Sequence, residues 1–346
     1  MRIFGYALRT MAVAALIAAA PSADTRDPTP PSGPARFDGD LSVMTYNIHG
    51  LPWPMAWDRP ADFARIAATL QTLRATGRNP QIVLLQEAFT SDAQAIGRAA
   101  GYRYIVDGPG EGAASAQPPA PADLRFAAAE SWSHGEGIGK WVGSGLQILS
   151  DFPIVGAHAM VYPGYACAGF DCLANKGALL VRIRLPGGGD PVDIVTTHLN
   201  SRRASDVPDE RSNHAHDRQL ACLTAFIRRF HDPRDALIVA GDFNAGQTQA
   251  RRSDLTERAR SWSLGAPVSN AYAAAERLRL PLSADARLSE RRGRDWEFFA
   301  PGRNTDVALR RIEVPFGHAA DGSMLSDHVG YAAVFAFQRR AVTTTL

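Results

Sequence analysis

Short apolar runs that end in dense polar clusters are the feature that most restricts how this sequence can fold. The runs are rich in Val, Ile and Leu and are bounded by Gly, Pro or Asp, a pattern typical of buried strands. They comprise residues 41–48, 81–85, 145–149, 178–183, 192–197, 236–240 and 331–337. Two further segments, 63–73 and 220–230, repeat apolar residues at helical spacing. Strands interleaved with few helices predict mixed β-sheets covered by helices.

The chain divides into a signal peptide, a Pro-rich linker, one large domain and a C-terminal tail, assigned to residues 1–23, 24–40, 41–338 and 339–346. In the first part, Arg2 and Arg9 accompany an apolar stretch that is too short to span a bilayer and ends in small residues, as in signal peptides. We therefore expect a periplasmic or secreted protein. The whole chain carries a formal charge of only +2, and a nearly neutral protein is poorly suited to indiscriminate binding of phosphate backbones.

The cysteines and one biased segment add detail within the large domain. Cys167 and Cys172 are close enough in sequence to pair, although so short a loop gains little stability from a disulfide. Cys222 lies in an apolar helical pattern, which predicts a buried free thiol. Residues 111–134 are rich in Ala, Pro and Gly and predict a long surface loop.

Polar clusters follow the apolar runs and contain Asn47, Glu87, His198, Asp242 and His328. Because strands converge at their ends, we expect these clusters to meet in one pocket. Their hard oxygen ligands suit Mg²⁺ or Mn²⁺ rather than zinc. A divalent ion beside imidazoles matches the needs of phosphate-ester hydrolysis, in which the metal stabilises the phosphate and an imidazole takes a proton from water.

The polar clusters also form an ordered set of motifs. The set comprises Met44-Thr45-Tyr46-Asn47-Ile48-His49-Gly50, Leu84-Leu85-Gln86-Glu87, Gly145-Leu146-Gln147-Ile148-Leu149-Ser150, Thr197-His198-Leu199, Gly241-Asp242-Phe243-Asn244 and Ser326-Asp327-His328. In this order they resemble the endonuclease/exonuclease/phosphatase superfamily. The resemblance implies an α+β fold, namely a four-layer α/β/β/α sandwich of two mixed β-sheets flanked by helices. It also implies a divalent metal, Mg²⁺ or Mn²⁺, in the cleft between the sheets.

The resemblance assigns three residues to the metal. Glu87 looks like the principal ligand, and Asn47 lies beside it at the metal or the phosphate. Asp327 matches the acidic residue that precedes the catalytic histidine, and we count it with the metal-binding residues. Glu87 directly follows an apolar strand, where an unpaired carboxylate would be costly unless it met a cation or donors.

The resemblance assigns five residues to catalysis. His328 looks like the general base, and Asp295 like the residue that orients it. Asp242 resembles the residue that orients the attacking water, and Asn244 the donor to the phosphate. His198 resembles the partner that stabilises phosphate charge or protonates the leaving group. The match at Asp295 is looser than the others, because the two residues that follow it depart from the usual Asp-Tyr-Ile-Phe pattern.

Within the superfamily, Asn175-Lys176-Gly177 resembles a stretch of the sphingomyelinase-like phosphodiesterases, and Lys176 is one of only two lysines. The leading hypothesis is therefore a secreted Mg²⁺-dependent phosphodiesterase acting on a choline-type phospholipid. A nuclease of the deoxyribonuclease I type and a phosphomonoesterase would use the same residues, and a binding protein without catalysis is the alternative outside enzymes. We expect a phosphoester substrate, favour a phospholipid head group over nucleic acid, and expect transient contact with a membrane surface. We expect a monomer without an obligate protein partner.

Two groups of surface residues have ordinary interpretations as well as functional ones. Trp53, Met55 and Trp57 could touch lipid, but packing against the edge of the sandwich is the expected role. Arg202-Arg203 and Arg251-Arg252 could steer an anionic substrate, but a solvated surface is the default interpretation.

Overall fold

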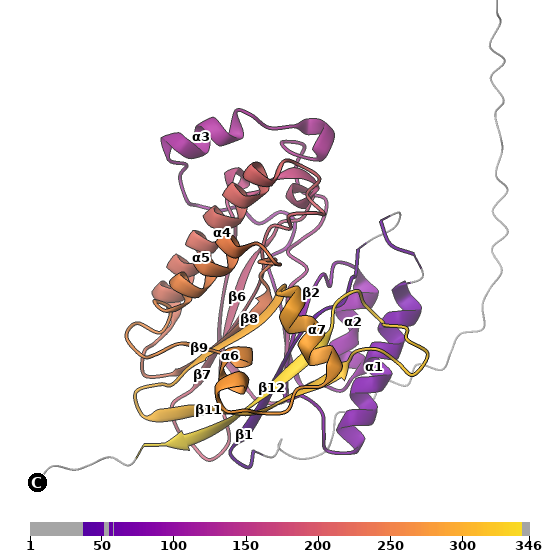
Figure 1. Ribbon diagram of the computed structural model, residues 1–346, viewed down its shortest axis with the longest axis vertical. Coiled ribbons are helices and arrows are strands. Elements are labelled where there is room, and N and C mark those ends of the chain that lie inside the picture. The colour runs from indigo at the N-terminus through magenta and orange to yellow at the C-terminus, as the bar shows by residue number, and fades with distance from the viewer. Residues whose placement is uncertain (1–36, 52–54, 58, 341–346) are drawn as a thin grey trace, which may run out of the picture.

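Two six-stranded β-sheets face each other in the computed structural model, which describes residues 37–51, 55–57 and 59–340 (Figure 1). The first sheet has the order β11-β12-β1-β2-β4-β3 and the second β5-β6-β7-β8-β10-β9. The strands are β1 (Asp40–Asn47), β2 (Ile82–Gln86), β3 (Tyr104–Asp107), β4 (Gln147–Ser150), β5 (Ile154–Val161), β6 (Gly177–Ile183), β7 (Val192–His198), β8 (Ala236–Asp242), β9 (Ser269–Asn270), β10 (Asp295–Ala300), β11 (Thr305–Phe316) and β12 (Gly330–Arg339). Both sheets are mixed, because β1 pairs with β2 and β7 with β8 in parallel whereas the other pairs are antiparallel.

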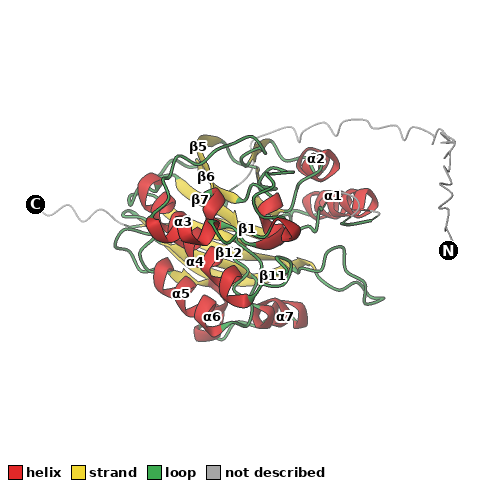
Figure 2. Ribbon diagram, turned by 90° about the horizontal axis from the view of Figure 1, so that it is seen from above, coloured by secondary structure: helices red, strands yellow, loops and turns green. Residues whose placement is uncertain are grey.

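Helices cover the outer faces of both sheets (Figure 2). On the first sheet, α1 (Arg59–Ala75) and α2 (Ser91–Ala99) bury their apolar faces against side chains of β1, β2 and β4. On the second sheet, α4 (Asp209–Phe230) and α5 (Gln249–Ala259) pack against β6, β7, β8 and β10. Two short helices, α6 (Ala271–Arg277) and α7 (Ala284–Arg292), pack near β10 and β11. The predicted α/β/β/α sandwich is therefore confirmed.

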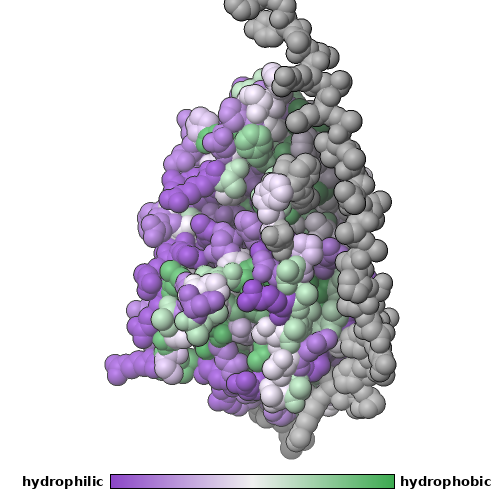
Figure 3. Space-filling view, turned by 90° about the vertical axis from the view of Figure 1, so that its right-hand side faces the viewer, coloured by the Kyte–Doolittle hydropathy of each residue, from purple (hydrophilic) through white to green (hydrophobic). Residues whose placement is uncertain are grey.

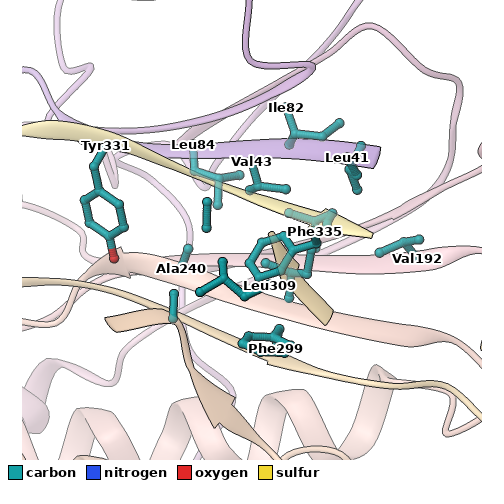
Figure 4. Packing of buried hydrophobic residues seen from close by; sticks show 14 of the residues in the cluster. Leu41, Val43, Ile82, Leu84, Val192, Ala240, Phe299, Leu309, Tyr331 and Phe335 are labelled. Atoms are coloured by element: carbon teal, nitrogen blue, oxygen red, sulfur yellow. The ribbon is translucent and has the colours of Figure 1, made fainter. Parts of the chain in front are cut away.

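The core between the sheets explains why the strands read as apolar runs. Leu41 and Val43 of β1 point into it, and Ile238 of β8 enters from the facing sheet. Figure 4 shows such side chains filling the space between the strands of the two sheets. The outward residues of β1, among them Met44, are buried beneath helices. Strands buried on both faces are apolar at nearly every position, and each large side chain so buried stabilises the fold by roughly 1.5–3 kcal/mol.

The predicted strands all form, within about two residues at each end. The edge strands escaped prediction, as did the interior strand β10, in which Asp295 and Glu297 interrupt the apolar pattern. In β5, Gly156 and His158 interrupt the apolar pattern, and about half of the strand is exposed. In β3, no residue is fully buried. Because these strands contact the core on only part of one face, they lack the apolar signal that marks the central strands.

The predicted domain boundaries can be compared with the structure only where the chain ends are described. The predicted signal peptide lies outside the described residues, as do most of the linker and residues 341–346 of the tail, so export remains a prediction. The sheet includes Asp40 at the start of β1 and Arg339 at the end of β12, one residue beyond the predicted domain at each end. Among the described helices, none combines the length and the apolar character that crossing a membrane requires.

The segment predicted as a long loop forms part of a folded insertion. It belongs to the connection between β3 and β4, residues 108–146, which we call the cap and which contains α3 (Pro121–Ala127) and a 3-10 turn, η1 (Trp132–His134). Figure 1 shows the cap, in magenta, above the start of α4. The backbone N–H of Gly108 donates to the Leu146 carbonyl at 2.7 Å, which closes the insertion at its own base.

Buried acidic residues fasten the cap to α4. Glu136 accepts hydrogen bonds from Arg211 Nε at 2.7 Å and from the backbone N–H groups of Gly169 at 2.7 Å and Ser131 at 2.6 Å. Asp123 accepts one from Arg218 Nη2 at 2.7 Å. Both carboxylates are almost fully buried, so their partners offset a desolvation cost that would otherwise oppose folding.

We predict that Glu136→Gln destabilises the protein in a pH-dependent manner. Burial would raise the pKa of Glu136, but the hydrogen bonds from Arg211, Gly169 and Ser131 outweigh it and lower the pKa. The stabilisation is therefore complete above the pKa of an unfolded glutamate, about 4.3, and is lost as the pH falls through the lower folded-state pKa. Because the amide would turn a donor toward other donors, we expect a loss of about 1–3 kcal/mol at pH 7.

Urea titrations of both proteins measure this difference, which should shrink when the pH falls below about 4. Glu130→Gln, at an exposed glutamate of the same cap, is the control and should change little. An equal cost of Glu136→Gln at pH 7 and pH 3 would contradict the assignment.

Candidate active site

The sheet topology brings the predicted polar residues to one end of the sandwich. His198 ends β7 and is paired in register with Asp242 at the end of β8, which in turn pairs with Asp295 at the start of β10. In the other sheet, Asn47 at the end of β1 lies beside the end of β2, which Glu87 follows. A cavity of about 590 Å³ opens at this end, and Glu87, His198, Asp242, Asn244, Asp327 and His328 line it.

Two of these residues have a strained backbone conformation that orients their side chains. Glu87 has a φ of 59° and Asn244 a φ of 47°, in the left-handed region that costs most residues about 1–2 kcal/mol. His49, with a φ of 51°, also lines the cavity. Gly50 is required beside them, because a Cβ at this position would lie 2.1 Å from the carbonyl oxygen of Glu87. Such strain is commonly kept where it orients functional groups.

Asn47 joins the two sheets beneath the floor of the cavity, behind the lining residues Glu87 and Asp242. Its Nδ2 donates to Glu87 Oε1 at 2.9 Å and to Asp242 Oδ2 at 3.0 Å. Burial would raise the pKa of Asp242, but the charges of His328 and His198 and the Asn47 hydrogen bond outweigh it and lower the pKa. Asp242 is therefore a buried carboxylate that stays ionised.

The donor set fits a hard divalent cation. Glu87 Oε2 is buried and has no hydrogen-bond partner among the described residues, an arrangement that a cation would satisfy. Asp242, Asp295 and His328 also offer ligand atoms within 4.8 Å of one another. Carboxylate and amide oxygens are the ligands that Mg²⁺ and Mn²⁺ prefer.

His328 and Asp295 form a buried pair. His328 Nδ1 lies 2.8 Å from Asp295 Oδ2, and Nε2 faces the cavity, 3.8 Å from Asp242 Oδ2. Burial disfavours the charged imidazole, yet the carboxylates of Asp295 and Asp242 outweigh it and raise the pKa of His328 to about 10. The protein groups alone therefore keep the imidazole protonated at neutral pH. A divalent cation bound beside it would oppose this charge and lower the pKa, which His328 requires to act as a general base.

His198 has the opposite environment and a partner that sequence reasoning did not place in the site. Its Nε2 lies 3.5 Å from Asp242 Oδ2 and 3.1 Å from Lys176 Nζ. Burial and the positive charge of Lys176 lower the pKa of His198. Lys176 is itself buried and pairs with Asp171 Oδ2 at 3.0 Å. The scarcity of lysine and the Asn-Lys-Gly stretch were the signals that pointed to it.

Asp327 and Asn244 lie at the site with partners of their own. Asp327 is 54% exposed at the rim, where its Oδ1 lies 3.0 Å from His49 Nδ1 and its Oδ2 lies 3.3 Å from Arg294 Nη1. Arg294 Nη1 also lies 3.3 Å from His328 Nε2. Asn244 donates its backbone N–H to Asp242 and its Nδ2 to the Leu199 carbonyl, each at 2.9 Å. The predicted roles of Asp327 as a ligand and Asn244 as a phosphate donor remain predictions.

The interpretation of Arg251 as a solvated surface residue was wrong. Arg251 is buried rather than solvated, because one face of α5 packs on the second sheet and the guanidinium binds Asn213 and the carbonyls of Asn200 and Asn244. Met55 and Trp57 are 49% and 71% exposed, whereas Trp53 lies outside the described residues.

The structure also shows how the cysteines are paired. Cys167 and Cys172 form a disulfide, and Cys222 is a buried free thiol as predicted. The disulfide encloses the 3-10 segment η3 (Gly169–Leu173), which supplies the Asp171 that pairs with Lys176.

Solved structures with this fold cover most of the chain. Sphingomyelinase C from Streptomyces griseocarneus is 19% identical with a TM-score of 0.54, over 85% of this chain and 99% of that one. A beta toxin mutant from Staphylococcus aureus with bound magnesium ions is 16% identical with a TM-score of 0.56, over the same shares. TDP2 of D. rerio, complexed with a single-strand DNA product, is 15% identical with a TM-score of 0.55, over 86% and 99%. At such identities these likenesses show the fold alone.

Proteins related in sequence narrow the family beyond the fold. Sphingomyelinases of Mycobacterium bovis and Mycobacterium tuberculosis are 29% identical over 209 residues, which is 60% of this chain. The chain spans about a third of the length of these curated relatives, since the match covers 35% of them. Residues 44–329 match the profile of the Endonuclease/Exonuclease/phosphatase family. Because this match covers most of the 346 residues, the chain belongs to the Endonuclease/Exonuclease/phosphatase family.

Proposed function

We propose that the chain is a divalent-metal-dependent hydrolase of phosphoric esters, and that it is a phosphodiesterase of the sphingomyelinase type. The observation that carries this proposal is the convergence, at the floor of one cavity, of an imidazole–carboxylate pair, an ionised buried aspartate and a carboxylate with an unpartnered oxygen. Family membership supports the same class of reaction.

Water activation falls to His328 in this proposal. Asp295 holds Nδ1, so Nε2 is the atom that faces the cavity and takes the proton of the attacking water. Asp242 lies within 4 Å of both His328 Nε2 and His198 Nε2, a position from which its carboxylate orients the water. The neighbouring carboxylates then stabilise the imidazolium that forms.

Positive and hydrogen-bond-donating groups of the cavity wall balance charge on the phosphate. The buried Lys176 and His198 form a hydrogen-bonded pair at the cavity wall, and Arg294 adds a guanidinium beside His328. Positive and donor groups held away from bulk water stabilise developing charge more strongly than they would in water. We assign Lys176 and His198 to the phosphate and the leaving-group oxygen.

Glu87 and Asn47 would hold Mg²⁺ or Mn²⁺, with Asp242 beside them. When bound, such an ion supplies Lewis acidity that stabilises negative charge on the phosphate oxygens. The magnesium ions named for the beta toxin mutant, which shares this fold, support the choice of ion.

The substrate class rests on the relatives and on the walls of the cavity. Sphingomyelinases are the sequence relatives, and Leu51, Met55, Phe89 and Phe170 give the cavity an apolar lining beside its charged floor. Such walls fit a lipid head group with adjoining apolar atoms. A nuclease is the second candidate, because the structural relative TDP2 is complexed with a DNA product.

We predict that activity requires both the metal and Glu87. EDTA should abolish hydrolysis of bis-(nitrophenyl) phosphate, and Mg²⁺ or Mn²⁺ should restore it. Glu87→Gln should lower kcat by about a hundredfold or more and should not respond to added Mg²⁺ at ordinary concentrations, since a ligand is lost. Glu313→Gln, at a half-exposed glutamate of β11, is the matched control. Activity that survives EDTA, or that only zinc restores, would refute the proposal.

We also predict unequal effects of the two members of the imidazole–carboxylate pair. His328→Ala should lower kcat by about 10²–10⁴-fold because the base is removed. Asp295→Asn should lower kcat less severely with little change in KM, because the imidazole remains but loses its orienting carboxylate. Steady-state kinetics measure both, with His158→Ala, at an exposed histidine of β5, as the control. A His328→Ala enzyme with normal kcat would rule out His328 as the base.

A substrate panel separates the sphingomyelinase reading from its rivals. We expect phosphocholine release from sphingomyelin and turnover of bis-(nitrophenyl) phosphate, with slower turnover of nitrophenyl phosphate and of plasmid DNA at low salt. The near-neutral charge of the chain is the reason for weak DNA cleavage, since duplex binding relies on several phosphate contacts. Plasmid nicking that outpaces phosphocholine release would favour the nuclease, and turnover of monoesters alone would favour a phosphomonoesterase.

A further inference from the structure

Large hydrophobic side chains are exposed on the cap and on the loop beside it. Trp132 is 78% exposed, Trp141 60% and Ile138 45%, all on the cap, and Phe170 of η3 is 43% exposed. We call these four residues the apolar rim. Figure 3 shows hydrophobic side chains exposed toward the upper end of the molecule, the end at which the cap lies in Figure 1. A clustered set of exposed apolar side chains marks an interaction surface more often than scattered ones do.

The apolar rim is held in place by hydrogen bonds around it. The backbone N–H of Trp141 donates to the Leu173 carbonyl at 2.7 Å, and Lys140 Nζ donates to the Cys172 carbonyl at 2.8 Å. Glu136 ties the turn that carries Trp132 to the N–H of Gly169, next to Phe170. The two segments therefore form one body, which presents the rings outward instead of letting them fold onto the surface.

The apolar rim is continuous with the mouth of the candidate active site. Phe170 belongs both to the rim and to the cavity lining, and Val142 and Leu173 continue the same wall inward. Met55, 49% exposed, lines the cavity from a different segment of the chain. A molecule resting on the rim would therefore have a path along apolar side chains to the charged floor.

The charges of the cap decide between kinds of partner. On residues 108–146, Glu111, Glu130 and Arg125 are exposed and Lys140 is partly buried. Asp123 and Glu136 are buried and paired with Arg218 and Arg211. Platforms that stack single-stranded nucleic acid combine aromatic rings with a basic groove, and attraction to anionic lipid also needs basic residues. An uncharged aromatic rim on a segment without a surplus of exposed basic residues fits neither. Trp, in contrast, favours the interface of a bilayer regardless of the net charge of the bilayer.

We propose that the apolar rim rests on a zwitterionic phospholipid bilayer and brings the cavity mouth to the head groups. The proposal rests on the proposed function and deepens it, because it makes the substrate a lipid within a membrane instead of a lipid monomer. The indole rings of Trp132 and Trp141 lie among the head groups, and Phe170 lines the route from the bilayer to the site.

Vesicle flotation tests this proposal separately from hydrolysis. Glu87→Gln protein, which is expected to leave the lipid intact, is mixed with vesicles of phosphatidylcholine and sphingomyelin at physiological salt. We expect binding, quenching of tryptophan fluorescence by brominated phosphatidylcholine, and a partition coefficient at least about tenfold lower after Trp132→Ala with Trp141→Ala, because buried apolar area sets the strength of such binding. Leu264→Ala with Leu278→Ala, at residues 40% and 56% exposed outside the cap, should bind like the parent.

Each other outcome counts against the proposal. Absence of vesicle binding by the parent, equal binding by the double tryptophan variant, or binding to single-stranded DNA in place of vesicles would overturn it. Urea unfolding midpoints verify that both double variants are folded. Binding without sphingomyelin hydrolysis by the unmodified enzyme would retain the apolar rim and reject the proposed substrate, so the two failures are distinguishable.

Discussion

The hydrogen bond from Asn47 to Asp242 is the interaction on which the candidate site depends. It crosses from one β-sheet to the other and joins residues 195 positions apart in the chain. The same amide nitrogen binds Glu87, so one side chain fixes carboxylates from both sheets at once. Two carboxylates so close together repel each other and lose hydration, and only the surrounding donors and positive charges make the arrangement tolerable.

The two histidines of the site have opposite environments although both contact the same aspartate. His328 is flanked by Asp295 and Asp242, which favour its protonated form, whereas His198 lies against Lys176, which favours its neutral form. Pairs of groups whose surroundings separate their proton affinities are typical of acid and base roles. The base role proposed for His328 requires that a bound cation oppose the protonated form that Asp295 and Asp242 favour. The separation here is built by backbone topology, because each histidine is placed by the end of a different strand pair.

The sequence predicts the central architecture well because the central strands are buried on both faces and therefore strongly apolar. It also predicts that Glu87 and Asp242 lie together, since they immediately follow or end such strands. Asn47 and Asp295, predicted for the same site, lie behind the residues that line the cavity. The sequence does not predict contacts between side chains that loops and helix faces bring together. That Asp327 meets His49, and that Arg251 turns inward, depend on loop backbone and helix rotation that leave no periodic signal.

The cap leaves and rejoins the first sheet between two neighbouring antiparallel strands, and a hydrogen bond at Gly108 seals its base. Its length and contents can therefore change without shifting strand register, provided that its bonds to η3, which supplies Asp171 to Lys176, are kept. Related enzymes could keep one set of reacting groups and exchange this insertion to meet different substrates. Substrate recognition could then diverge while the catalysed reaction stays the same.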